Sequence, residues 1–64
     1  MIRIKGSENK TIEMDHELTI NDIIKQYKID AERYAIILNG SPATEDENVR
    51  PEDDLLFLEV FSGG

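Results

Sequence analysis

The spacing of apolar residues changes from a strand period to a helix period and back, and this constrains the fold most. Near the start, Ile2 and Ile4 alternate with basic residues, and Ile12 and Met14 alternate with polar ones. A polar, glycine-bearing segment at 6–10 separates the two runs. The pattern predicts a hairpin of two half-buried strands over residues 1–15, with these four side chains facing inward.

Helical spacing of apolar residues then follows and predicts a helix from about Ile20 to Lys28. Residues 19–22, Thr-Ile-Asn-Asp, fit a capping box in which Asp22 replaces the preferred glutamate. Leu18 precedes the cap and can pack on Ile23. Since no glycine directly follows Lys28, the C-terminal end of this predicted helix is less well defined than its N-terminal end.

Two apolar runs after the helix predict two more strands, Tyr34–Leu38 and Leu55–Phe61. The turn dipeptide Asn39-Gly40 ends the first run. Residues 41–54 are polar and irregular, with a short turn or strand near Val49.

This order predicts an α+β chain with a four- to five-stranded mixed sheet and one main helix on one face. The topology that fits is the β-grasp, or ubiquitin-like fold, with the first and last strands side by side in the centre. The chain has 64 residues, which suits a single domain. We expect that domain over residues 1–61 and a flexible tail at 62–64.

The later strands are apolar on both faces, although one short helix can cover only one face of a sheet. Either a face made of Ile37, Leu56, Leu58 and Val60, or the alternate set of side chains, should therefore remain open. Exposed apolar faces usually mark interaction surfaces. The other reading is that residues 41–54 fold over it. This segment offers few apolar side chains, so we favour a partner-docking surface.

Composition argues against several classes of function. Fourteen acidic and seven basic residues give a formal charge of −7, which disfavours binding to nucleic acid or to an anionic membrane surface. No apolar run approaches the roughly 20 residues of a membrane span. The chain has no cysteine, which excludes thiol chemistry and suits a cytoplasmic location.

No side-chain pattern of catalysis stands out in the sequence. The one histidine, His16, lies in a polar turn and is best explained as a solvated loop residue. The acidic residues of 45–54 lack the ligand spacing and central glycine of a calcium loop. We therefore predict a protein that is not itself an enzyme, with no catalytic side chain, bound metal or resident cofactor.

Three segments carry a resemblance to a known family: residues 19–24, residues 35–40, and the last strand running into Gly63-Gly64. Together they resemble the ubiquitin-like sulfur carriers of the ThiS/MoaD family, and the length is closer to ThiS. Ser41–Glu45 departs from the Val-Pro-Arg-like stretch that ThiS proteins often carry there. Pro51–Asp54 lacks the glycine that they tend to have before the last strand.

The resemblance implies a carrier for sulfur. The Gly64 carboxyl would be adenylated with ATP by a ubiquitin-activating-like adenylating enzyme and converted to a thiocarboxylate. The sulfur would come from a donor such as a cysteine desulfurase or a rhodanese. It would pass to a sulfur-accepting synthase such as thiazole synthase, in thiamine thiazole biosynthesis. Phe61, Ser62 and Gly63 would enter the partner's active site, and the open apolar face would dock the activating enzyme.

Three alternatives stay open at this point. The chain could carry sulfur for molybdopterin or tRNA thiolation. It could be a ubiquitin-like modifier that is conjugated through Gly64 to lysines of target proteins. It could also be a plain interaction domain whose terminal glycines are incidental.

Overall fold

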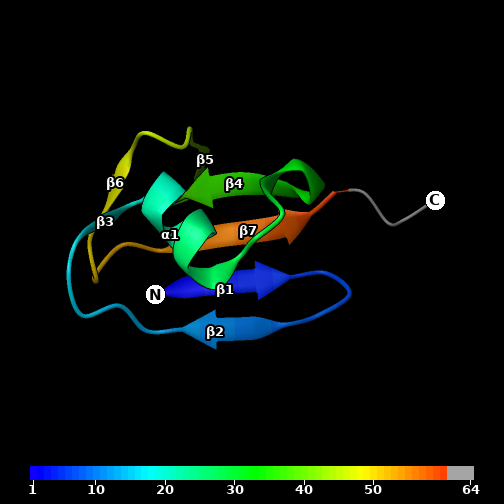
Figure 1. Ribbon diagram of the computed structural model, residues 1–64, viewed down its shortest axis with the longest axis horizontal. Coiled ribbons are helices and arrows are strands. Elements are labelled where there is room, and N and C mark those ends of the chain that lie inside the picture. The colour runs from blue at the N-terminus through cyan, green and yellow to red at the C-terminus, as the bar shows by residue number, and fades with distance from the viewer. Residues whose placement is uncertain (61–64) are drawn as a thin grey trace.

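The computed structural model describes residues 1–60 as one main sheet with a helix across it (Figure 1). The elements in chain order are β1 (Ile2–Lys5), β2 (Lys10–Ile12), β3 (Leu18–Thr19), α1 (Ile20–Tyr27), the 3-10 helix η1 (Ala31–Arg33), β4 (Tyr34–Leu38), β5 (Ser41–Pro42), β6 (Asn48–Val49) and β7 (Leu55–Glu59).

The five strands of the main sheet lie in the order β2-β1-β7-β4-β5. β1 and β7 pair in parallel with Ile2 opposite Leu55, and β7 pairs antiparallel with β4. The first and last strands are thus neighbours, and the last one is central. This confirms the predicted α+β fold, which matches the β-grasp arrangement.

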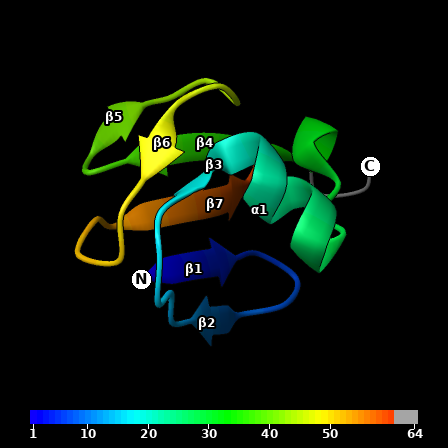
Figure 2. The same cartoon turned by 60° about the vertical axis from the view of Figure 1, so that its left-hand side comes forward.

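The core lies between the sheet and α1, which crosses one face of it (Figure 2). Its buried side chains are Ile2, Ile4, Ile20, Ile23, Val49, Leu55 and Phe57. Tyr34 packs edge-on against Phe57, with ring centroids 6.3 Å apart. Ile12 and Met14 pack against this core, as the alternation predicts.

The capping box begins α1 as predicted. Thr19 Oγ1 accepts a hydrogen bond from Asp22 N at 3.0 Å, and Asp22 Oδ2 accepts one from Thr19 N at 3.3 Å. At the other end, Lys28 adopts the left-handed conformation with φ 55° and ψ 47°. Glycine usually occupies this position, so its absence explains why the helix end was the less defined one.

Three details differ from the prediction. The last strand, which was expected to reach Phe61, ends at Glu59, and Val60 lies outside it. The second strand ends at Ile12 because Ile12 pairs with Ile2, where β1 begins, and nothing in β1 remains to pair with residues 13–15. Residues 41–54 are more ordered than expected. β6 pairs with β3, with Val49 opposite Leu18. Val49 is buried in the core, so the strand suggested near this residue is confirmed.

Candidate functional site

The candidate site is the face of the sheet opposite α1, formed by alternate residues of its two central antiparallel strands. The register places Ile37 opposite Leu56 and Ala35 opposite Leu58. We call Ala35, Ile37, Leu56, Leu58 and Val60 the open face. Leu58 is 39% exposed and Val60 63% exposed, whereas Phe57, between Leu56 and Leu58, is fully buried on the other side.

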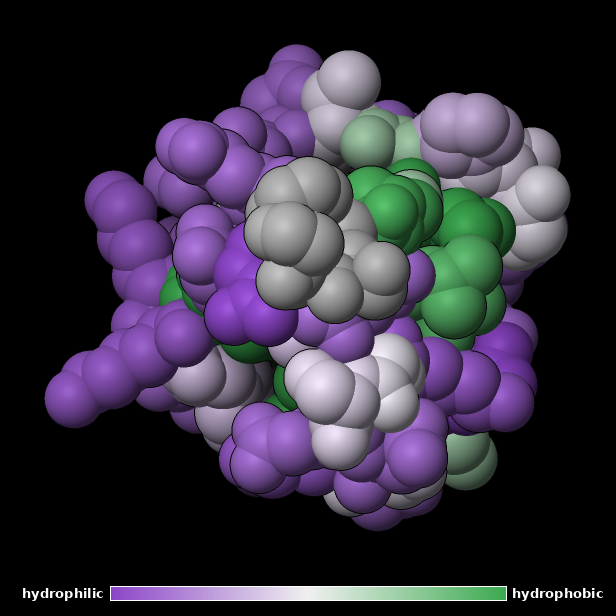
Figure 3. Space-filling view, turned by 90° about the vertical axis from the view of Figure 1, so that its right-hand side faces the viewer, coloured by the Kyte–Doolittle hydropathy of each residue, from purple (hydrophilic) through white to green (hydrophobic). Residues whose placement is uncertain are grey.

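Figure 3 views the molecule from the end at which β7 finishes, and hydrophobic residues gather on the side away from α1. Residues 41–54 do not cover this face with Val49, because Val49 packs in the core on the helix side of the sheet. Of the predicted set, Leu58 and Val60 are exposed, and Ile37 and Leu56 are partly buried. Ala35 is an addition that the strand register supplies.

Basic residues border the open face on β1. Arg3 lies opposite Leu56 and Lys5 opposite Leu58. Arg3 makes a two-point contact with Asp54, with Nε 3.0 Å from Oδ1 and Nη2 2.7 Å from Oδ2. The face thus has an apolar centre and a charged rim, as protein interaction surfaces commonly do.

A second feature, which sequence reasoning missed, lies at the end of β7. The Glu59 side chain is only 7% exposed. Its Oε1 accepts hydrogen bonds from Ser7 N at 2.7 Å and Ser7 Oγ at 3.0 Å, and its Oε2 accepts one from Arg33 Nη2 at 2.8 Å. We call Ser7, Arg33 and Glu59 the Glu59 cluster. The hydrogen bonds from Ser7, and next the Arg33 guanidinium, lower the pKa of Glu59.

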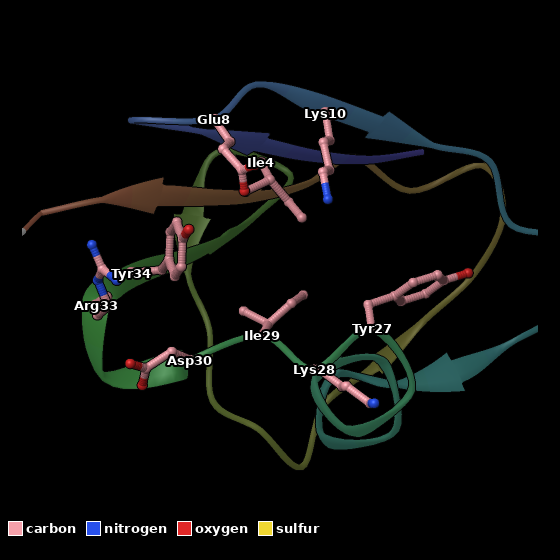
Figure 4. Close-up of a pocket in the computed structure, with 9 residues that line it drawn as sticks. All are labelled: Ile4, Glu8, Lys10, Tyr27, Lys28, Ile29, Asp30, Arg33 and Tyr34. Carbon is pink, nitrogen blue, oxygen red and sulfur yellow. The ribbon is translucent and has the colours of Figure 1, made fainter.

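A pocket of about 220 Å³ lies on the helix side, between the β1–β2 hairpin, the end of α1 and the start of β4 (Figure 4). Its lining is Ile4, Glu8, Lys10, Tyr27, Lys28, Ile29, Asp30, Arg33 and Tyr34. Acids and bases are mixed around it, and no lining residue has the pairing of nucleophile and base that catalysis requires. We therefore take the open face, and not this pocket, as the candidate site.

The remaining candidates from the sequence lie in exposed loops. His16 Nδ1 lies 2.5 Å from Asp15 Oδ1, and both side chains are largely exposed. This contact lowers the pKa of Asp15. Within residues 1–60, no group of three or more acidic or histidine side chains is arranged to hold a metal ion. No helix in the same range is long and apolar enough to cross a membrane.

The predicted tail residues Phe61, Ser62, Gly63 and Gly64 lie outside the described residues. The last described residue, Val60, donates its backbone N–H to the carbonyl oxygen of Arg33 at 3.0 Å. The backbone that precedes the tail is therefore fixed to the residue before β4.

Comparisons with known proteins name the family. No match is found among curated proteins. The family model described as small archaeal modifier protein 2 matches residues 1–60, which is nearly the whole chain. This is a family of ubiquitin-like small modifiers related to the ThiS/MoaD carriers, in agreement with the broader resemblance. The chain belongs to the small archaeal modifier protein 2 family.

Proposed function

We propose that the chain is a carrier protein whose Gly64 carboxyl is activated as an acyl adenylate and then transferred. The observation that carries this proposal is the family match over residues 1–60, followed in the sequence by a Gly-Gly end. The fold agrees, because β7, the strand that precedes these glycines in the sequence, lies at the centre of the sheet. The proposal requires that Gly64 bear the free α-carboxylate.

Activation is chemically necessary because a C-terminal carboxylate, with a pKa of about 3.3–3.7, is ionised at neutral pH and is a poor electrophile. An oxygen of the carboxylate attacks the α-phosphorus of ATP, and pyrophosphate leaves. The resulting acyl adenylate carries AMP as a leaving group. Gly63 and Gly64 suit this step because, without a Cβ, they enter a narrow channel and leave the carbonyl accessible.

The family description favours transfer to an amine. In that case a lysine amine of a target protein attacks the activated carbonyl, directly or through an enzyme thioester, and forms an isopeptide bond as AMP or the thiol leaves. The word modifier in the family description supports this outcome.

The resemblance to sulfur carriers supports a second outcome. A persulfide sulfur displaces AMP, and reductive cleavage of the S–S bond by a thiol leaves a thiocarboxylate on Gly64. That sulfur would serve a synthase of thiamine thiazole, or alternatively molybdopterin synthesis or tRNA thiolation. Both outcomes begin with the same adenylate, so the activating step is common to them.

The partner in this step is a ubiquitin-activating-like adenylating enzyme, the class with which modifiers of this type work in general. We propose that it docks on the open face. Leu58 and Val60 are exposed apolar side chains next to the point where the chain leaves the sheet. Docking there would hold the tail near the enzyme's nucleotide site.

The test is ATP–pyrophosphate exchange with the purified activating enzyme of the same host. Exchange that depends on the carrier supports the proposal. The matched control is the chain without Gly63 and Gly64, which keeps every described residue and should support no exchange. Equal exchange with the shortened chain would show that the glycines are incidental and would favour a plain interaction domain.

A further inference from the structure

Glu59 occupies an unusual place for a carboxylate. Leu55, Phe57 and Glu59 alternate on the same side of β7, and the first two are fully buried in the core. Tyr34, directly opposite Glu59, also packs against the core. An apolar side chain would fill this position at the end of the strand, yet the chain places a charge there.

The contacts of Glu59 join three separate parts of the chain. Ser7 belongs to the β1–β2 turn, and Arg33 ends η1 just before β4. The turn also approaches closely through Gly6, because a Cβ on Gly6 would collide with Glu59 Cβ. A carboxylate with so little exposure to water is stable only when it is paired and hydrogen-bonded, so these contacts fix one position for its side chain.

Arg33 holds the next residue as well. Its carbonyl oxygen accepts the N–H of Val60 at 3.0 Å, while its guanidinium binds Glu59. The last strand residue and the residue after it are thus tied to the same partner. The backbone direction at the end of β7 is set by this double contact.

The direction of the backbone at the end of β7 affects where the residues after Val60 can reach. From Glu59 to Gly64 is at most about 17 Å of extended chain. When the partner's channel holds the residues after Val60 extended, a change of about 10° at the start of this segment would displace its end by about 3 Å. A misplacement of about 1 Å at a reacting atom can lower a rate by about 100-fold.

We propose that Glu59 is a positioning residue for the reaction of Gly64: with Ser7 and Arg33, it fixes the direction in which the chain leaves β7 relative to the open face. The inference rests on the proposed activation of Gly64. Glu59 acts through the backbone and contacts neither ATP nor the reacting carboxyl.

The test compares Glu59→Gln with the matched control Glu32→Gln. Both variants remove one negative charge, but Glu32 is an exposed residue of η1 outside the cluster. Glutamine keeps the shape of the side chain and loses the ion pair with Arg33. Circular dichroism and urea unfolding first establish that both variants fold.

Carrier-dependent ATP–pyrophosphate exchange then separates positioning from docking. For Glu59→Gln we expect kcat to fall by about 10-fold and the KM for the carrier to change by less than about twofold, since the open face is intact. Arg33→Gln should give a similar loss, and the double variant should be no worse than either single one. Amide exchange at Val60 should become faster in Glu59→Gln and not in Glu32→Gln.

The outcomes are distinguishable. If Glu59→Gln has the kcat of Glu32→Gln while the wild type supports exchange, the positioning role is wrong and the proposed function stands. If KM rises at unchanged kcat, Glu59 acts in docking and the inference is overturned. If the folded wild-type chain supports no exchange at all, the proposed function fails, and the positioning role fails with it.

Discussion

The open face predicts that adjacent residues of β7 have opposite roles, and Leu58→Ala tests this. Leu58 is 39% exposed, so truncating it removes only part of a buried surface, and we expect a loss of about 1 kcal/mol in the free energy of unfolding. Phe57 is fully buried, and Phe57→Ala should cost about 3–5 kcal/mol. A chain of 64 residues has about 3–10 kcal/mol in total, so Phe57→Ala should remove a large share of its stability.

Binding to the activating enzyme should depend strongly on Leu58, although stability depends on it only weakly. If Leu58 is a central contact with the activating enzyme, Leu58→Ala should cost about 2 kcal/mol of binding, which is roughly a 30-fold increase in Kd. Isothermal titration calorimetry with the activating enzyme measures Kd, and urea unfolding measures stability.

The matched control is Tyr27→Ala. Tyr27 is 37% exposed, nearly the same as Leu58, but it lies on α1 on the other side of the sheet. We expect its Kd to equal that of the wild type. Wild-type binding by a folded Leu58→Ala variant, or equal weakening by both variants, would refute the assignment of docking to the open face.

Three further predictions concern single positions. Lys28→Gly should raise the free energy of unfolding by about 0.5–1 kcal/mol, because glycine adopts the left-handed conformation of Lys28 without steric cost; a loss in urea unfolding would contradict this. Because the folded-state pKa of Glu59 is lowered, its stabilising contribution is present above the unfolded-state pKa of about 4.3 and is lost as the pH falls through the folded-state value. Thermal unfolding of Glu59→Gln should therefore depend less on pH below about 5 than that of the wild type, and an unchanged dependence would exclude this role. Gly64→Ala should unfold as the wild type does and be adenylated more slowly, and an equal rate of pyrophosphate exchange would show that a Cβ is tolerated there.

The main elements were predictable because each has a strong local signal. The capping box begins α1 at Ile20, and the apolar run Tyr34–Leu38 is a strand over the same residues. The pairing of β3 with β6 was not predictable in detail, because strands of two residues have no period to detect. The sequence signal for it is Val49, an apolar residue in a polar segment, and the structure buries this residue in the core.

The sequence predicts that one apolar face of the sheet stays exposed, because one short helix can cover only one face. Which of the two sets of side chains forms that face could not be predicted from the alternation alone. Glu59 was missed because one more acidic residue in an acidic chain suggests solvent exposure. The signal was present in the alternation of Leu55, Phe57 and Glu59, which places the carboxylate on the core side. Its pairing with Ser7 and Arg33 depends on contacts between distant segments and could not be read from local patterns.

The ThiS assignment was finer than the family match supports. The match is to a modifier family, and the sequence departs from the ThiS pattern at Ser41–Glu45 and at Pro51–Asp54. The broader resemblance to ubiquitin-like carriers agrees with the family. The thiamine pathway stays a proposal for the destination of the activated group.

The most direct test of the central claim is mass spectrometry of the chain purified from its own host, with the modified residue located in the C-terminal peptide. We expect modification at Gly64. Isopeptide linkage to lysine would establish the modifier function, and a gain equal to the replacement of one oxygen by sulfur would establish the thiocarboxylate. A free Gly64 carboxylate in every molecule, both from the host and after incubation with ATP and the activating enzyme, would contradict the claim.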